Sequence, residues 1–204
     1  MYKKKLILLI PYRKRVGFDK DYLEKFLTYM NEFLNNLTSS FSIYIIEQDN
    51  DLPFNRGLLL NIGFLELEKI KTNNEIYYYC FHNIDTYPIN NSITKSYLYT
   101  DTIRNLYENG ILIINANLFK TINGFPNNMW GWGSEDYCLN HRYKIKGITI
   151  ENLNKNNCFH EDKNNNITNS SYNKFNSSII MFNNTGLNNC IYNCEIIDNW
   201  IKIF

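Results

Sequence analysis

The sequence has no surplus of charge of either sign. It carries 21 lysines and arginines against 20 aspartates and glutamates, which gives a net charge of +1. Non-specific binding to nucleic acid or to an anionic membrane depends on a strongly basic surface. We therefore expect no nucleic-acid partner.

Long hydrophobic runs are also missing near the N-terminus. The first apolar run, Leu6–Ile10, stops at Pro11. A signal peptide needs about 7–15 apolar residues, and a membrane helix needs about 20. The run therefore predicts a buried strand rather than a signal peptide or a membrane span. The cytoplasm is then the default expectation for the location of the protein.

The sequence lacks the Cys-x-x-Cys pairs of a zinc ribbon, and its 5 cysteines are an odd number. Paired metal-binding cysteines are therefore not expected. The pattern favours free, partly buried thiols. A disulfide between Cys190 and Cys194 stays open as an alternative.

Predicted strands and helices alternate along the first 85 residues, and this order indicates the fold. Short apolar runs predict strands, and residues that recur every three or four positions predict helices. This order of strand and helix is typical of a parallel sheet with covering helices. We predict one α/β domain over residues 1–204, with a mainly parallel sheet and helices on both faces. The predicted strands are Leu6–Ile10, Phe41–Ile46 and Ile76–Phe81, and the predicted helices are Tyr22–Leu37 and Asn55–Ile70.

The second half of the chain is less regular. Strands are predicted at Ile111–Ile114 and Gly147–Ile150, with a helix at Ser134–Lys146 between them. Asn152–Asn176 is polar and has no apolar period, so it predicts a long loop, which in a compact domain is usually functional or disordered. The tail from Ile179 to Phe204 gives no clear pattern.

Polar residues follow each of the first three predicted strands. Right-handed connections place the carboxyl ends of such strands at one edge, where open α/β sheets bind their ligands. Asn83 and Asp85 can face the same way, because alternate residues of an extended chain do. Their oxygens suit Mn²⁺ or Mg²⁺, although an Asp after a strand is also a common turn former. The polar stretches are Pro11–Arg15, Gln48–Asn50 and His82–Asp85.

The stretch Asn123–Asp136 combines glycines, two tryptophans and two acids. Tryptophan rings offer flat apolar faces, which can stack on the C–H faces of sugars. Glu135 and Asp136 lie at a predicted helix N-terminus, whose dipole favours the ionised form that a general base needs. The alternative interpretation is a glycine-rich loop with an acidic helix cap.

Four stretches together resemble the β-1,4-galactosyltransferase family of the GT-A fold. They occur in the family order, and the resemblance covers about residues 6–160, with the last stretch the most specific. It implies a GT-A fold and a metal-dependent transfer of sugar from a uridine diphosphate (UDP) donor. The stretches are Ile10–Arg15, Phe54–Phe64, Phe81–Pro88 and Ile122–Asp136.

The resemblance also implies roles for individual residues. Asp136 matches the catalytic base, and Mn²⁺ or Mg²⁺ is the implied cofactor. The donor nucleotide would contact Pro11, Arg13, Arg15, Phe54, Arg56 and Asn83. The metal would be held by Asp85, His160 and Asn157, with His160 at the hinge of a mobile loop. The sugars and the acceptor would contact Trp132, Glu135, Gly110 and Tyr107.

Three positions depart from the family pattern. Asn83 replaces an Asp that faces the donor, and Tyr137 replaces a third acid of the acceptor site. The thioether metal ligand of the family falls on Asn157, or on Cys158 if the register slips. The change at Tyr137 puts the usual N-acetylglucosamine acceptor in doubt.

The predicted function is an inverting transfer of galactose from UDP-galactose to a hydroxyl of a sugar acceptor. Two alternatives stay open: a transferase of another UDP-sugar, N-acetylgalactosamine or glucose, and a catalytically inactive glycan-binding module. A glycosidase that uses Glu135 and Asp136 as its pair is disfavoured, because neighbouring residues of a helix point about 100° apart.

Overall fold

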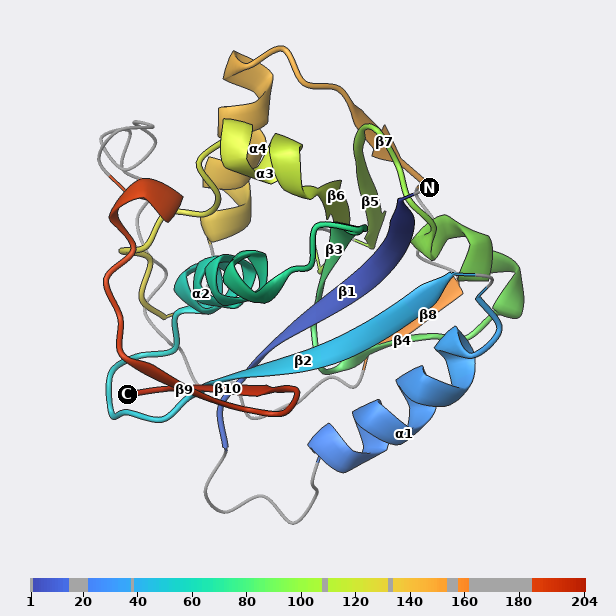
Figure 1. The fold of residues 1–204 in the computed structure, drawn as a ribbon, viewed down its shortest axis with the longest axis horizontal. Helices are drawn as coiled ribbons and strands as arrows, with labels where there is room; N and C mark the ends of the chain where they lie inside the picture. The colour runs from blue at the N-terminus through green and yellow to red at the C-terminus, as the bar shows by residue number, and fades with distance from the viewer. Residues whose placement is uncertain are drawn as a thin grey trace.

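The fold is described from a computed structural model, which places residues 2–14, 22–37, 39–107, 110–131, 134–153, 158–161 and 185–204. An eight-stranded sheet forms its centre (Figure 1). In spatial order the strands are β7 (Ile150–Asn152), β5 (Ile103–Tyr107), β6 (Ile111–Asn115), β3 (Glu75–His82), β1 (Lys3–Tyr12), β2 (Ser40–Gln48), β10 (Trp200–Ile203) and β9 (Cys194–Ile197).

The middle of this sheet is parallel. β1 pairs in parallel with both β2 and β3, and β10 continues the sheet in parallel with β2. Antiparallel pairs occur on either side, between β3 and β6, between β5 and β6, and between β9 and β10. The prediction of a mainly parallel sheet is confirmed.

Side chains of β1 alternate between two apolar cores, one on each face of the sheet. Ile7 and Leu9 pack with α2 (Arg56–Ile70), whereas Leu6 and Leu8 pack with α1 (Tyr22–Leu34). This alternation follows from the period of two in a strand. All four side chains are fully buried. The prediction of helices on both faces is therefore confirmed (Figure 1).

The elements after β3 are shorter. They include a separate two-stranded sheet of β4 and β8 and two short helical segments, η1 and α3, before α4. Their bounds are β4 (Thr86–Pro88), η1 (Asn91–Tyr97), α3 (Ala116–Thr121), α4 (Glu135–Ile145), β8 (Phe159–Glu161) and η4 (Leu187–Asn189).

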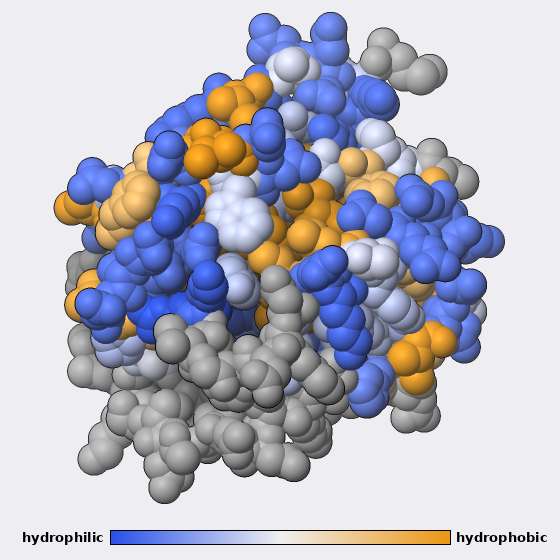
Figure 2. Space-filling model, turned by 90° about the horizontal axis from the view of Figure 1, so that it is seen from below, coloured by the Kyte–Doolittle hydropathy of each residue, from blue (hydrophilic) through white to orange (hydrophobic). Residues whose placement is uncertain are grey.

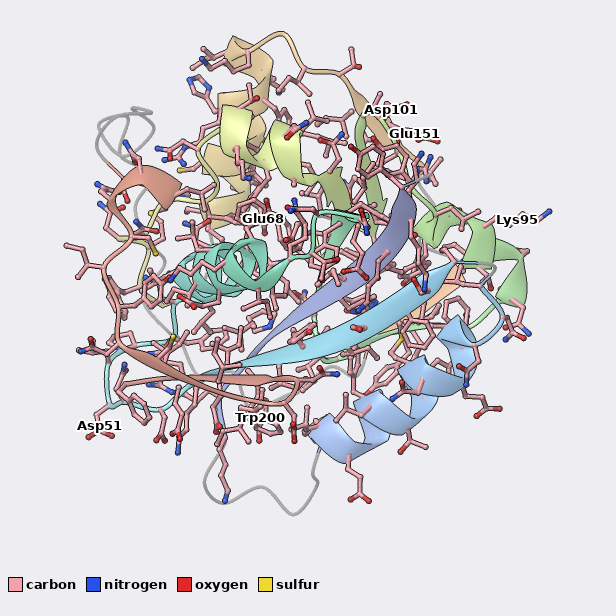
Figure 3. The ribbon with its side chains drawn as sticks, viewed as in Figure 1. Asp51, Glu68, Lys95, Asp101, Glu151 and Trp200 are labelled. Atoms are coloured by element: carbon pink, nitrogen blue, oxygen red, sulfur yellow. The ribbon has the colours of Figure 1, made fainter. Side chains whose placement is uncertain are left out.

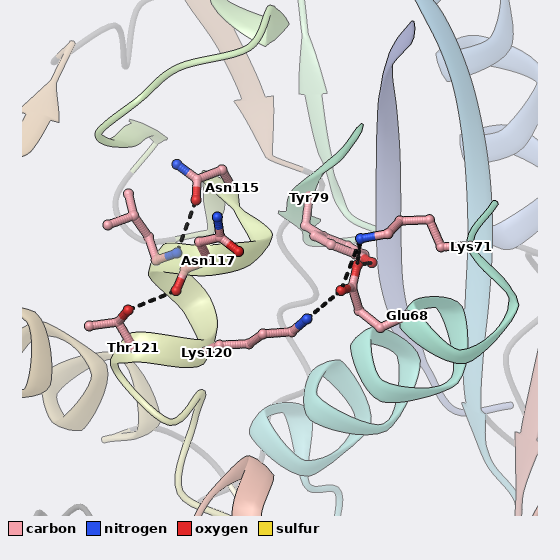
Figure 4. Close-up of polar contacts among 8 residues, drawn as sticks. Glu68, Lys71, Tyr79, Asn115, Asn117, Lys120 and Thr121 are labelled. Atoms are coloured by element: carbon pink, nitrogen blue, oxygen red, sulfur yellow. Dashed lines mark hydrogen bonds and ion pairs between the residues drawn. The ribbon is translucent and has the colours of Figure 1, made fainter. Parts of the chain in front are cut away.

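A charged cluster ties α3 to α2. The carboxylate of Glu68 accepts hydrogen bonds from Lys71, from Tyr79 at 2.8 Å and from Lys120 at 2.6 Å (Figure 4). Burial alone would raise the pKa of Glu68, but the hydrogen bonds from Lys120 and Tyr79 bring it below its usual value. Glu68 is therefore charged at neutral pH and has a structural role.

Three predictions for the second half need correction. The predicted strand Gly147–Ile150 begins only at Ile150, because Gly147 has a φ of +65° and ends α4. The predicted loop Asn152–Asn176 contains β8, although residues 154–157 and 162–176 lie outside the described part. The tail forms η4, β9 and β10, which no pattern predicted.

All 5 cysteines are free thiols, so the prediction is confirmed and the link between Cys190 and Cys194 does not form. Burial raises the pKa of Cys190 to about 12. Among the described helices, none is long and apolar enough to cross a membrane.

Candidate active site

The carboxyl ends of β1 and β2 form one rim of the candidate site. Arg13, just after β1, donates to the backbone oxygens of Asn50 and Leu52. Gln48, at the end of β2, donates to Pro53 O at 3.1 Å and accepts from Asn55 N at 2.9 Å. These bonds hold the loop that connects β2 to α2. The view from below in Figure 2 shows apolar residues exposed in a hollow with hydrophilic walls.

Trp200 of β10 closes the outer side of this rim (Figure 3). Its indole nitrogen donates to a carboxylate oxygen of Glu47 at 2.9 Å. Its ring lies edge-on to Tyr12, with 6.1 Å between the ring centroids. The last strand of the chain thus packs against the predicted donor-binding end of β1.

The start of α2 lies directly behind the rim. The side chain of Asn55 caps the helix by accepting from Leu58 N at 3.0 Å, as expected for an Asn at this position. Phe54 is half-buried, and its backbone oxygen accepts from Gly131 N at 2.8 Å. The cap therefore fixes the start of α2, and with it the position from which the side chain of Arg56 extends.

His82 orients the turn that follows β3. Its Nδ1 lies 2.8 Å from Asn83 O and its Nε2 lies 3.1 Å from the hydroxyl of Tyr97. Burial lowers the pKa of His82 to about 4, so the ring is neutral at pH 7. Because a carbonyl oxygen can only accept, Nδ1 carries the proton and Nε2 accepts from Tyr97.

Asn83 is held on its other side by Gly110. Asn83 N donates to Gly110 O at 3.0 Å. A Cβ at residue 110 would lie 2.8 Å from Asn83 Nδ2, so a larger residue there would displace the Asn83 amide. The predicted contact of Gly110 with a sugar stays a prediction, but its packing against Asn83 is clear.

Arg56 joins this turn to the two acids of α4. Its Nε donates to Asn83 Oδ1 at 3.0 Å, and its Nη1 donates to Asp136 Oδ1 at 3.1 Å. The same Nη1 lies 3.6 Å from Glu135 Oε1. One guanidinium therefore bridges the end of β3 and the first turn of α4.

Asp136 has the acid–base properties of a general base that works near neutral pH. Burial raises its pKa to about 6; Arg56 acts against this shift, whereas the charge of Glu135 adds to it. With this pKa the carboxylate is still mostly ionised at pH 7, and the contribution of the helix dipole stays a prediction. A base is most effective when its pKa lies near the operating pH.

The pairing of β4 with β8 brings the predicted metal ligands together. Tyr87 is paired with His160 and Thr86 with Glu161, and Asp85 directly precedes β4. Asp85, in the turn that leads into β4, is thus two residues from the strand partner of His160. A carboxylate and an imidazole at this spacing fit a divalent ion such as Mn²⁺.

The third predicted metal ligand is not part of this strand pair. Within the described ranges, no group of three His, Cys, Asp or Glu side chains could hold an ion. The third predicted ligand, Asn157, lies outside them. Tyr107 lies beside β8, with 5.3 Å between its ring and that of Phe159.

Two family models match the chain. One describes the N-terminal region of glycosyl transferase group 7 and matches residues 1–98. The other describes the N-terminal domain of galactosyltransferase and matches residues 96–165. β-1,4-Galactosyltransferase 1 of Homo sapiens is 32% identical over 167 residues, which cover 74% of this chain and 39% of that protein. The chain belongs to the β-1,4-galactosyltransferase family.

Other relatives agree with this assignment. The xylosylprotein 4-beta-galactosyltransferase of Caenorhabditis elegans is 32% identical over 145 residues, which cover 65% of this chain and 47% of that protein. The chain thus spans less than half the length of these curated relatives.

A solved structure confirms the GT-A fold. The catalytic domain of the Drosophila β1,4-galactosyltransferase 7, solved with xylobiose, superposes with a TM-score of 0.74 at 25% identity. The match covers 98% of this chain and 92% of that one. A mutant of the Drosophila enzyme was solved with manganese, UDP-Gal and xylobiose, with a TM-score of 0.72 at 23% identity.

The structure brings several of the predicted site residues together. Arg56, Asn83, Glu135 and Asp136 form one connected group. Pro11 and Arg13 lie at the end of β1, and Phe54 lies at the start of α2. Three predicted residues, Arg15, Trp132 and Asn157, lie outside the described part of the chain.

Sequence reasoning missed the residues that hold the loop before α4. Asn61, Asn127 and Arg142 are the main ones, and each bonds to a segment distant in sequence. Asn is so frequent in this chain that a single functional Asn does not stand out. A fully buried Arg on a helix gives no signal in an apolar pattern.

Proposed function

We propose that this chain transfers galactose from UDP-galactose to a hydroxyl of a sugar acceptor, with inversion at the anomeric carbon and with a divalent ion. The bond between Arg56 and Asp136 carries the proposal, because the same guanidinium holds Asn83 beside the predicted metal turn. The proposed base and the turn that carries the proposed metal ligand Asp85 are thus connected through Arg56. The Drosophila complex with manganese, UDP-Gal and xylobiose supports this choice of donor and metal.

Asp136 acts first in the proposed reaction. Its carboxylate takes the proton from the acceptor hydroxyl while that oxygen attacks the anomeric carbon of galactose. The bond between this carbon and the diphosphate breaks from the opposite side, and UDP leaves with the bonding electrons. A positioned general base typically contributes about 10²–10⁴ in rate.

Arg56 has two effects on the base. Its hydrogen bond fixes Oδ1 of Asp136, and its positive charge opposes the rise in pKa that burial causes. Asp136 is therefore mostly charged at pH 7, although its side chain is half-buried. Glu135 is buried beside Asp136, and the two carboxylates together would accept hydrogen bonds from the acceptor hydroxyls.

Asp85 and His160 are the residues that would hold the metal ion. A divalent ion there supplies Lewis-acid stabilisation of the charge that builds up on the diphosphate. The protein contributes the fixed turn after β3, which His82 and Gly110 hold in place.

A donor screen tests the proposal. UDP release is measured with UDP-galactose, UDP-N-acetylgalactosamine and UDP-glucose, each with and without a sugar acceptor, in Mn²⁺ and in chelator. We expect the fastest release with UDP-galactose and acceptor, and background release in chelator.

Each other outcome has a defined meaning. Faster release from another donor identifies a transferase of that sugar. Sugar binding without release from any donor identifies an inactive glycan-binding module. Equal rates in Mn²⁺ and in chelator would remove the proposed role of Asp85 and His160.

A further inference from the structure

Asn127 lies at the crossing of three segments that are far apart in sequence. Its backbone oxygen accepts from Asn55 Nδ2 at 2.8 Å, and its Oδ1 accepts from Asn61 Nδ2 at 2.7 Å. Its backbone nitrogen donates to Thr185 Oγ1 at 2.6 Å, and its Nδ2 donates to Gly186 O at 2.7 Å. All four polar groups of this one residue are therefore used, two toward α2 and two toward the tail.

The tail segment Thr185–Asn189 follows the loop Asn123–Asn127 closely. Leu187 N donates to Asn123 O at 3.1 Å, and Asn188 N donates to Asn123 Oδ1 at 3.0 Å. Gly186 has a φ of +151°, and a Cβ at this position would overlap Asn123 O. The two segments touch so tightly that one cannot shift without the other.

Arg142 extends this contact to α4. The fully buried guanidinium donates from Nη1 to Asn123 O at 2.8 Å and to Gly124 O at 2.7 Å, and from Nη2 to Thr185 O. Because α4 also carries Glu135 and Asp136, the loop, the tail and the acids form one packed unit.

The stretch that follows Asn127 is fastened at both ends. Asn127 fixes its start, and four residues later Gly131 N donates to Phe54 O at 2.8 Å. Between them lie the exposed Asn128, the buried Met129 and the half-buried Trp130. The bonds of Asn127 therefore determine where the chain enters the tryptophan-rich stretch that precedes the acids.

We propose that Asn127 is a positioning residue of this transferase, and that Thr185 of the tail is its partner in holding residues 128–131 at the acceptor side of the site. The role in acceptor use rests on the function proposed above. The family models end at residue 165, so they do not include the tail residue that takes part.

The test uses two nearly isosteric variants and one matched control. Thr185→Val removes the acceptor of Asn127 N, and Asn127→Asp removes the donor to Gly186 O while keeping the acceptor for Asn61. Tyr192→Phe is the control. It removes a hydrogen bond between the same tail and Glu66 of the same helix α2, away from the loop.

Two readouts separate positioning from general stability. The first is the acceptor KM together with the affinity for UDP in Mn²⁺. We expect the acceptor KM to rise about tenfold in both test variants, because small displacements of a binding group cost up to about 10² in rate. UDP affinity should stay within about twofold, because the rim is built by other residues, and Tyr192→Phe should change neither quantity.

The second readout is amide hydrogen exchange at Gly131, which does not depend on activity. We expect exchange at least about tenfold faster in Thr185→Val and Asn127→Asp, and unchanged in Tyr192→Phe, since an amide exchanges through local opening. If folded test variants keep wild-type exchange and acceptor KM, or if Tyr192→Phe matches them, the proposal is wrong. If the wild type transfers no sugar, the proposed function fails, and the exchange comparison still decides the positioning role.

Discussion

The two halves of this galactosyltransferase family member are held together by different forces. In the first half, β1 lies between two parallel strands, and Leu6–Ile10 are fully buried on both faces. In the second half, short elements are tied by buried polar side chains: Asn61 reaches across from α2 to Phe125 O, and Arg142 of α4 donates to Gly124 O. Apolar burial thus fixes the strands of the first half and the positions of their carboxyl ends. Single polar side chains fix the position of Glu135 and Asp136 in the second half.

The largest effect is expected at Asp136, which depends on the second kind of interaction. Asp136→Asn keeps the size of the side chain but cannot take a proton, so transfer should fall by at least about 10². Initial rates measure this loss, and calorimetric titration with UDP and Mn²⁺ should show donor affinity near the wild-type value. Glu135→Gln is the matched control. If it abolishes transfer while Asp136→Asn retains most of it, the base has been assigned to the wrong acid.

Stability measurements compare the two halves directly. Leu8→Ala removes a fully buried side chain from β1. It should lower the free energy of unfolding by about 2–5 kcal/mol, with acceptor KM unchanged in the molecules that remain folded.

Arg142→Met leaves buried carbonyl oxygens without their donor, which should cost about 1–3 kcal/mol. It should also raise acceptor KM.

Urea unfolding and transfer kinetics on the same samples check this contrast. A normal acceptor KM in Arg142→Met would mean that polar ties in the second half contribute stability alone. A raised acceptor KM in Leu8→Ala would mean that the two halves are not separable.

The pH profile gives the smallest expected effect. The pKa of Asp136 is raised to about 6, chiefly by burial. Its protonated form cannot act as a base, so transfer should be constant above about pH 7 and fall as pH decreases through 6. Below that point the fall should approach tenfold per pH unit. The kcat/KM for the acceptor between pH 5 and pH 8 measures it, because this quantity follows the pKa of the free enzyme, and a flat profile down to pH 5 would contradict the assignment of Asp136.

The first half could be predicted well from the sequence, for a physical reason. A run such as Leu6–Ile10 predicts a buried strand by itself, because all of its residues are apolar. No knowledge of the neighbouring strands is needed. The strands of the tail could not be predicted in this way. β9 is mostly exposed and forms because β10 gives it a partner, and β10 in turn forms beside the edge of β2.

The site shows the same division. The strand pattern predicted Asn83 at the ligand-binding edge of the sheet, and the family resemblance assigned Arg56, Glu135 and Asp136 to donor and acceptor binding. The structure joins these four residues. Their interactions were beyond prediction, since the bond from Arg56 to Asp136 depends on exact distances between α2 and α4. The high pKa of Asp136 depends on burial, which a helix-terminus argument does not include.

The position of β10 also bears on how safely the chain can be shortened. Ile201 pairs with Ile46 and is fully buried, so the last strand covers the outer edge of β2. A chain cut before Thr185 would expose the unpaired backbone of a long strand that carries Ile43, Ile45 and Ile46. Such an edge is a template for pairing with other chains. We therefore expect a chain without its C-terminal strands to aggregate and not to fold into a shorter active protein.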